Sequence, residues 1–165
     1  SSFARMPSPK FKKININDTI KRAVEFYKMS SKNEIFFIEP NKNIIINGDE
    51  EQLYRVFTNL IKNSEESIHE KKEKNKLFKG KIYIDIEDNN DYISIKLSDN
   101  GMGINDPTKI MTPYFTTKKT GTGLGLPIVS KIINEHNGEI SISNNNPGAA
   151  FLITLQILNK WKQRF

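Results

Sequence analysis

The stretch EEQLYRVFTNLIKNSEESIH, residues Glu50–His69, decides the fold of this chain. Its apolar side chains recur at intervals of three and four residues, which places them along one face of an α-helix. The residues of this stripe are Leu53, Val56, Phe57, Leu60 and Ile61. A turn sequence, Asn47–Asp49, comes directly before the stretch. We therefore predict a helix from about Glu50 to His69 that buries its apolar face in the core.

Two asparagines stand four residues apart on this predicted helix and therefore share a face. Asn63 lies at the edge of the apolar stripe, where a core helix would border a cleft, and Asn59 lies one turn before it. The oxygen of a carboxamide is a suitable ligand for Mg²⁺, which prefers a few protein oxygens together with water and phosphate. Two asparagines alone are a weak indication, so a metal site is only one of the open explanations.

The segment after this helix has the alternating pattern of a β-hairpin. Apolar and polar residues alternate in two runs that are separated by Asp88–Asp91, a turn-forming sequence. The alternating apolar residues are Ile82, Ile84 and Ile86 in the first run and Ile93, Ile95 and Leu97 in the second. We predict an antiparallel hairpin with one buried face.

Weaker patterns predict the remaining elements. Asn17 is a plausible N-cap for a helix that ends near Met29, and the apolar spacing of Leu126, Ile128, Val129, Ile132 and Ile133 predicts another helix. Short strands are expected at Ile35–Ile38, Ile44–Ile46, Glu139–Ser143 and Ala150–Leu158, the last two as a hairpin.

Length and composition indicate one domain with one core. The chain has 165 residues and a mass of 19.0 kDa, with 36% hydrophobic and 27% charged residues. It has no cysteine, which excludes disulfides and thiolate metal sites, and its two histidines cannot build a histidine-rich zinc site. No run approaches the roughly 18 apolar residues that span a bilayer. We expect a piece that is soluble and lies in the cytoplasm.

The net charge of +6 and the pI of about 9.4 favour an anionic partner. Much of the excess lies in Lys71–Lys81, which has six lysines against one glutamate. This segment has one aromatic residue, Phe78, and no arginine, whereas proteins that bind single strands usually supply stacking platforms. We interpret it as a solvated loop and expect no nucleic acid partner.

The sequence Asp99–Gly103, DNGMG, follows directly after the second strand of the predicted hairpin. That position puts a carboxylate at the end of a strand, and the glycines permit close approach of the backbone to a ligand. Asp99 could accept a hydrogen bond from the exocyclic amine of adenine. A turn in which Asp and Gly serve only the backbone remains the alternative.

A long loop follows, and two parts of it could face phosphate. Thr120–Leu126, TGTGLGL, places three glycines before a helix, where backbone N–H groups and the helix dipole suit phosphate oxygens; the alternative is a hinge. It matches neither the P-loop nor the dinucleotide-binding pattern. In Pro113–Lys118, PYFTTK, Phe115 could pin the loop while Lys118 approaches phosphate, or both could be surface residues.

In this order, four segments resemble the N, G1, F and G2 boxes of the histidine kinase catalytic domain, a member of the gyrase, Hsp90, histidine kinase and MutL superfamily. The segments are Asn59–Asn63, Asp99–Gly103, Pro113–Lys118 and Thr120–Leu126, and the resemblance runs from about Lys10 to Leu158. Ser1–Pro7, Pro113–Tyr114 and Asn63–Ile68 further resemble NtrY-type nitrogen-regulation kinases.

The resemblance implies a two-layer α/β sandwich of the Bergerat type, with a mixed, largely antiparallel sheet, about three helices on one face and a mobile lid over ATP. It implies that Asn63 coordinates Mg²⁺ and that Asp99 binds the adenine amine. The residues implied in nucleotide binding are Asn63, Asp99, Gly101, Gly103, Ile104, Phe115, Thr116, Thr117, Gly121, Thr122, Gly123, Leu124 and Gly125. Asn59, Lys62 and Lys118 would act near the phosphates.

One position bears on the reaction. Relatives that hydrolyse ATP carry a glutamate one helical turn before the metal-binding asparagine, and Asn59, which occupies that place, cannot act as a base. Phosphoryl transfer needs mainly positioning and charge neutralisation, so transfer is favoured over hydrolysis. Many members have a basic residue where this chain has Glu66, which leaves cationic help to Lys62 or Lys118.

We therefore expect a linker at residues 1–9, a catalytic ATP-binding domain at residues 10–158 and a tail at residues 159–165. The histidine that receives the phosphate would lie in a dimerisation domain before Ser1 and would pass it to a response regulator. A membrane anchor, if there is one, would lie in the missing N-terminal part and would be in the inner membrane. The alternatives are a nucleotide-sensing module and an ATP hydrolase. His69 and His136 are expected to be structural rather than catalytic.

Overall fold

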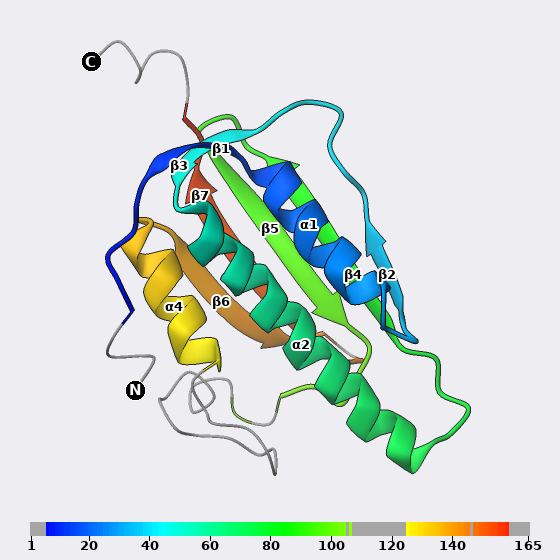
Figure 1. Cartoon of the computed structure of the whole chain (residues 1–165). Coiled ribbons are helices and arrows are strands. Elements are labelled where there is room, and N and C mark those ends of the chain that lie inside the picture. Colours follow the sequence, from blue (N-terminus) through cyan, green and yellow to red (C-terminus); the bar gives the residue numbers. More distant parts are fainter. Residues whose placement is uncertain (1–5, 105, 107–124, 146, 159–165) are drawn as a thin grey trace.

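The computed structural model describes residues 6–104, 106, 125–145 and 147–158, and in these residues three helices lie over one face of a sheet (Figure 1). The helices are α1 (Ile16–Lys28), α2 (Glu50–Lys74) and α4 (Gly125–Glu135). The sequence prediction of a two-layer α/β sandwich is thus confirmed. None of the described helices is long and apolar enough to cross a membrane.

The main sheet is mixed and mostly antiparallel, with the strand order β2-β4-β5-β7-β6. Its strands are β2 (Glu34–Phe37), β4 (Lys81–Asp88), β5 (Tyr92–Asp99), β6 (Glu139–Asn144) and β7 (Ala149–Gln156). Only β2 pairs in parallel, with β4, and β4 and β5 form the predicted hairpin. A separate antiparallel pair, β1 (Lys12–Asn15) with β3 (Ile45–Gly48), lies at one end. The predicted alternation therefore identifies the β4–β5 hairpin of this sheet correctly.

The core lies between the sheet and the helices. Every second side chain of the β4–β5 hairpin is turned toward the helices, and Ile82, Ile93 and Leu97 are at most 1% exposed. Each side chain of this size contributes about 1.5–3 kcal/mol when it is removed fully from water. The apolar stripe of α2 is completely buried against them, including Phe57. The helix with the strongest sequence pattern is therefore also the one at the centre of the core.

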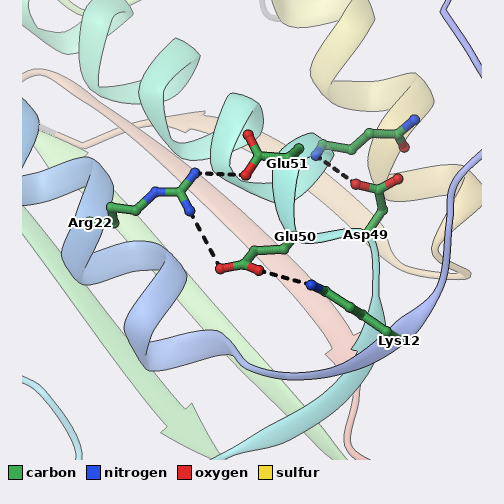
Figure 2. A network of polar contacts seen from close by, with 6 residues as sticks. Lys12, Arg22, Asp49, Glu50 and Glu51 are labelled. Atoms are coloured by element: carbon green, nitrogen blue, oxygen red, sulfur yellow. Dashed lines mark hydrogen bonds and ion pairs between the residues drawn. The ribbon is translucent and has the colours of Figure 1, made fainter.

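The first turn of α2 is fixed by a cap and by charged neighbours (Figure 2). Asp49 is the N-cap, and its Oδ1 accepts a hydrogen bond from the backbone N–H of Gln52 at 3.0 Å. Arg22 of α1 lies between Glu50 and Glu51, at 3.4 and 3.1 Å. Exposed pairs of this kind contribute little to stability, about 0–1 kcal/mol, so the cap is the stronger constraint.

The N-terminal prediction was wrong in two details. The N-cap of α1 is Asn15, whose side chain accepts a hydrogen bond from the backbone N–H of Asn17, so Asn17 itself lies inside the helix. Strand β1 was not predicted, because Lys12–Asn15 has only one buried apolar residue and its pairing with β3 is a long-range contact.

The lysine-rich segment also differs from its prediction. Helix α2 continues past His69 to Lys74, so part of Lys71–Lys81 is helical rather than a solvated loop. Ile68 is completely buried, which draws the helix onto the sheet beyond its expected end. The lysines at this end of α2 include side chains that bind other parts of the fold: Lys72 Nζ donates to Asn33 Oδ1 at 2.8 Å.

His136 joins the ends of two helices. Its Nδ1 lies 2.7 Å from the carbonyl oxygen of Ile132, and its Nε2 accepts a hydrogen bond from the backbone N–H of Asp49 at 3.0 Å. This supports the expected structural role at the end of α4. The residue after His136, Asn137, has a positive φ of 56°.

Candidate functional site

Asn63 lies on the middle of α2, half-buried, on the side that faces α4 and the end of β5. Its Nδ2 donates a hydrogen bond to the carbonyl oxygen of Asn59 at 2.9 Å. This bond fixes the orientation of the carboxamide, because the nitrogen is held against the helix and the oxygen must lie on the opposite side. Asn59 is also half-buried, whereas Lys62 is exposed.

Asp99 is the last residue of β5 and is 3% exposed. Its Oδ2 accepts a hydrogen bond from Ser64 Oγ at 2.9 Å, and its Oδ1 accepts one from the backbone N–H of Gly101 at 2.8 Å. Because Ser64 follows Asn63 directly, the carboxylate lies beside the helix position that the sequence assigns to metal binding. Two predicted site residues from distant parts of the chain are therefore brought to one place.

Burial raises the pKa of Asp99 above its usual value, although the hydrogen bonds from Gly101 and Ser64 and the charge of Lys71 act in the opposite direction. A buried carboxylate with a perturbed pKa is more common at functional sites than elsewhere in a structure. The carboxylate can accept about four hydrogen bonds in all. Within the described residues, Gly101, Ser64 and the backbone of Ala149 use most of this capacity.

Gly101 lies directly against the backbone of α2. A Cβ atom at this position would be 2.8 Å from the carbonyl carbon of Ser67 and 2.9 Å from the backbone nitrogen of Ile68. The next residue, Met102, donates its backbone N–H to Ser67 Oγ at 2.8 Å. Glycine is therefore required here by close packing against α2, whereas the sequence suggested close approach of the backbone to a ligand.

The rest of the turn is held by the β6–β7 connection. Gly103 has a φ of +83°, a conformation that favours glycine. Ile104 is bound on both sides by one side chain: its backbone N–H donates to Asn144 Oδ1 at 2.7 Å, and its carbonyl oxygen accepts from Asn144 Nδ2 at 2.8 Å. Gly148, with a φ of +89°, packs against the backbone of Asp99. A pocket of about 440 Å³ lies beside this turn.

Gly125, the last glycine of the TGTGLGL segment, begins α4 and faces Asn63. A Cβ atom at Gly125 would lie 4.0 Å from Asn63 Nδ2. The start of α4 is therefore next to the predicted metal-binding position. The other predicted residues of the loop lie outside the described residues: Phe115, Thr116, Thr117, Lys118, Gly121, Thr122, Gly123 and Leu124.

The sequence reading missed the side chains that hold this arrangement together. Ser64, Ser67 and Lys71 bind the turn from α2, and Asn144 binds it from β6. The spacing of three and four residues between the three α2 positions was a signal that they share a face with the site. No local pattern in the sequence connects Asn144 with Ile104, because the two residues are 40 positions apart.

The α2 helix, the DNGMG turn and the start of α4 all lie in a part of the chain that matches a known protein family. Residues 48–159 match the family described as histidine kinase-, DNA gyrase B- and HSP90-like ATPase. The chain belongs to this ATPase family. The matched residues include each described part of the site, from the N-cap of α2 to the end of β7.

Several curated relatives of the chain carry names of the NtrY group. The chain is 35% identical over 153 residues to an NtrY-like sensor histidine kinase of Rickettsia conorii, covering 91% of the chain and 24% of the relative. It is 30% identical over 159 residues to the nitrogen regulation protein NtrY of Azorhizobium caulinodans, covering 95% of the chain and 20% of the relative. The chain thus spans a fifth to a quarter of these curated relatives, and the predicted similarity to NtrY-type kinases is confirmed.

Solved structures lead to the same group. The catalytic domain of histidine kinase ThkA superposes with a TM-score of 0.77 at 28% sequence identity, covering 89% of this chain and 97% of that one. Since nearly all of the ThkA catalytic domain is matched, the chain corresponds to a histidine kinase catalytic domain of the Bergerat type. The individual roles assigned to site residues stay predictions.

Proposed function

We propose that this chain binds Mg-ATP and transfers its γ-phosphate to a histidine in a dimerisation domain outside this sequence, as the catalytic domain of a two-component sensor histidine kinase. The observation that carries the proposal is the approach of Asn63, Asp99 and Gly125, which come from α2, β5 and α4 to one end of the sheet. In this arrangement the base of a nucleotide would meet Asp99 and its phosphates would reach Asn63.

The residues present fit a magnesium ion held together with a nucleotide. The carboxamide of Asn63 would supply an oxygen ligand, and its orientation is already fixed by the bond from its nitrogen to Asn59. The ion would neutralise charge on the phosphates when it is bound. At the other end, Asp99 would accept a hydrogen bond from the adenine amine, with Gly101, Gly103 and Ile104 shaping the base pocket.

Transfer is favoured over hydrolysis by the side chain that comes one turn before Asn63. The side chain of Asn59 is an amide, which cannot take a proton from water. Its backbone carbonyl oxygen accepts the hydrogen bond from Asn63 Nδ2. Positioning of the nucleotide and a nucleophile from another domain would then complete the site. Lys62 is exposed and would be available to the phosphates, together with Lys118 in the loop.

The proposal extends to partners and place in the cell. The phosphate would pass from the histidine to an aspartate of a response regulator, and a membrane anchor would be supplied by parts of the protein outside this chain. The matched segment makes up only 24% and 20% of two curated relatives, which therefore have room for such parts.

The test is binding of a non-hydrolysable ATP analogue by calorimetry, with and without Mg²⁺. We expect Asp99→Asn to weaken binding at least tenfold in either condition, because the amide presents a donor toward the adenine amine. We expect Asn63→Ala to remove most of the gain from Mg²⁺ while leaving magnesium-free binding nearly unchanged. Asn47→Ala, an exposed asparagine of β3, is the matched control.

Unchanged binding in both variants would refute the site assignment. Phosphate incorporation after addition of a dimerisation domain from the full-length protein would support transfer. Steady release of phosphate by the chain alone would instead support the hydrolase alternative.

A further inference from the structure

One face of α2 carries a row of polar side chains that hold the DNGMG turn. Ser64 binds Asp99, Ser67 accepts the backbone N–H of Met102, and Lys71 binds the carbonyl oxygens of the same turn. The three positions are three and four residues apart, so they lie one above another on the helix. The turn is therefore attached to α2 along about two helical turns.

Lys71 is the outermost member of this row. Its Nζ donates to the carbonyl oxygen of Asn100 at 3.0 Å and lies 3.5 Å from that of Gly101. The same ammonium lies over the ring of Phe78, 4.5 Å from its centre. Lys71 also lines the pocket beside the turn, together with Gly103. A half-buried cation with three separate partners is a built contact and not a solvated surface charge.

The ammonium of Lys71 also acts on Asp99 through space. Lys71 favours the ionised form of the Asp99 carboxylate, against the effect of burial, which raises its pKa. The neighbouring positions on the other packed strands, Ile82 of β4 and Ala149 of β7, carry no charge. Among the groups that face Asp99 in the described residues, Lys71 is therefore the charged one.

We propose that Lys71 is a positioning residue for base recognition: it holds the Asn100–Gly101 backbone and keeps the Asp99 carboxylate ready to accept the adenine amine. This inference rests on the proposed function, because it assumes that Asp99 meets the base. It assigns a role to the lysine-rich end of α2, which the sequence reading treated as a solvated loop.

The experiment measures affinity for a non-hydrolysable ATP analogue and for its inosine counterpart, in which an oxygen replaces the exocyclic amine. Lys71→Met keeps the apolar stem near Phe78 and removes the charge. We expect its preference for adenine over inosine to fall about tenfold, since a charge-assisted contact to the turn is lost. Lys71→Arg should restore most of the preference. The control is Lys72→Met, which changes an equally half-buried lysine that binds Asn33 instead of the turn.

The pH profile gives a second measurement that a merely structural role would not move. Without the charge of Lys71, Asp99 should take up a proton at a higher pH. As the pH is lowered, the affinity of Lys71→Met for the ATP analogue should therefore begin to fall at a higher pH than that of the wild type. Lys72→Met should follow the wild-type profile. Circular dichroism and thermal unfolding of each variant show whether the fold is kept; if Lys71→Met does not fold, Lys71→Gln takes its place in both measurements.

The outcomes separate this inference from the proposed function. A wild type that binds neither nucleotide, or binds both equally, overturns the assignment of Asp99 and the inference with it. A wild type that prefers adenine while Lys71→Met keeps the same preference and the same pH profile overturns the inference alone. A loss of preference in Lys72→Met equal to that in Lys71→Met also overturns it, because the effect would then not depend on contact with the turn.

Discussion

At the scale of single residues, Asp99 shows how a site can oppose the stability of its own fold. The carboxylate is 3% exposed, and its surroundings stabilise the charge only in part, so burial leaves its pKa raised. A group whose pKa is higher in the folded than in the unfolded state favours folding when it is protonated. That contribution is complete below the unfolded value of 3.8 and is lost as the pH rises through the folded value.

It follows that Asp99→Asn should change the pH dependence of stability. The amide has no charge to bury, so the melting temperature of the variant relative to the wild type should increase as the pH rises from 4 to 7. Hydrogen bonding adds a constant offset but does not alter this direction. Thermal unfolding across the pH range measures the effect, with Asp85→Asn, an exposed carboxylate of β4, as the control. A constant difference between Asp99→Asn and the wild type would contradict the prediction.

At the scale of elements, the distance between α2 and the DNGMG turn is set by a glycine. Gly101→Ala would place a methyl group against the backbone of α2, which cannot move as a flexible side chain could. We expect a loss of about 1–3 kcal/mol in the free energy of unfolding, the usual cost of overpacking. Gly125→Ala is the matched comparison, because among the described residues the nearest neighbour of its Cβ, Asn63 Nδ2, would be 4.0 Å away and alanine favours a helix.

Chemical denaturation measures both variants. Gly101→Ala should unfold at a lower denaturant concentration than the wild type, whereas Gly125→Ala should unfold at an equal or higher one. Equal midpoints for the two variants would show that α2 and the turn are not in firm contact.

Elements whose sequence signal is local were predicted correctly. The alternation in Ile82–Leu97 and the helical stripe from Leu53 to Ile61 each reflect burial of one face, which a short window records. The motifs around Asn63 and Asp99 are equally local, so these parts of the candidate site could be proposed from the sequence.

Features that depend on long-range contacts were missed. Asn15 and Asn17 are equivalent N-cap candidates by residue type, and only the pairing of β1 with β3 decides between them. Lysine-rich composition suggested a solvated loop at Lys71, but that side chain has its partner 29 residues further along. The row on α2 that holds the turn could therefore be found only from the folded structure.

At the scale of the whole molecule, α2 connects the two ends of the domain. Its 25 residues extend about 37 Å and cross the sheet beneath it (Figure 1). At its beginning it is capped by Asp49 and joined to α4 through His136; further along it carries Asn63, and then it holds the turn after β5. A ligand that binds Asn63 and Asp99 together would therefore stabilise the contact between the helix layer and the sheet.

Binding of Mg-ATP should thus stabilise the whole fold. An ATP analogue at 100 times its dissociation constant adds about 2.7 kcal/mol to the free energy of unfolding. One kcal/mol shifts the melting temperature of a domain of this size by about 2–4 °C, so we expect an increase of about 5–11 °C. Differential scanning fluorimetry with and without Mg²⁺ measures the shift, and Asp99→Asn should lose most of it.

The net charge of +6 requires a control, because a basic protein also attracts polyphosphate without recognising a base. Inorganic triphosphate with Mg²⁺, at the same concentration as the analogue, gives the size of that unspecific effect. A shift from the analogue that exceeds the triphosphate shift in the wild type, but equals it in Asp99→Asn, would locate the extra stabilisation at the base. Equal shifts from both ligands in the wild type would mean that charge alone explains the binding, and that the contact between Asp99 and adenine does not form.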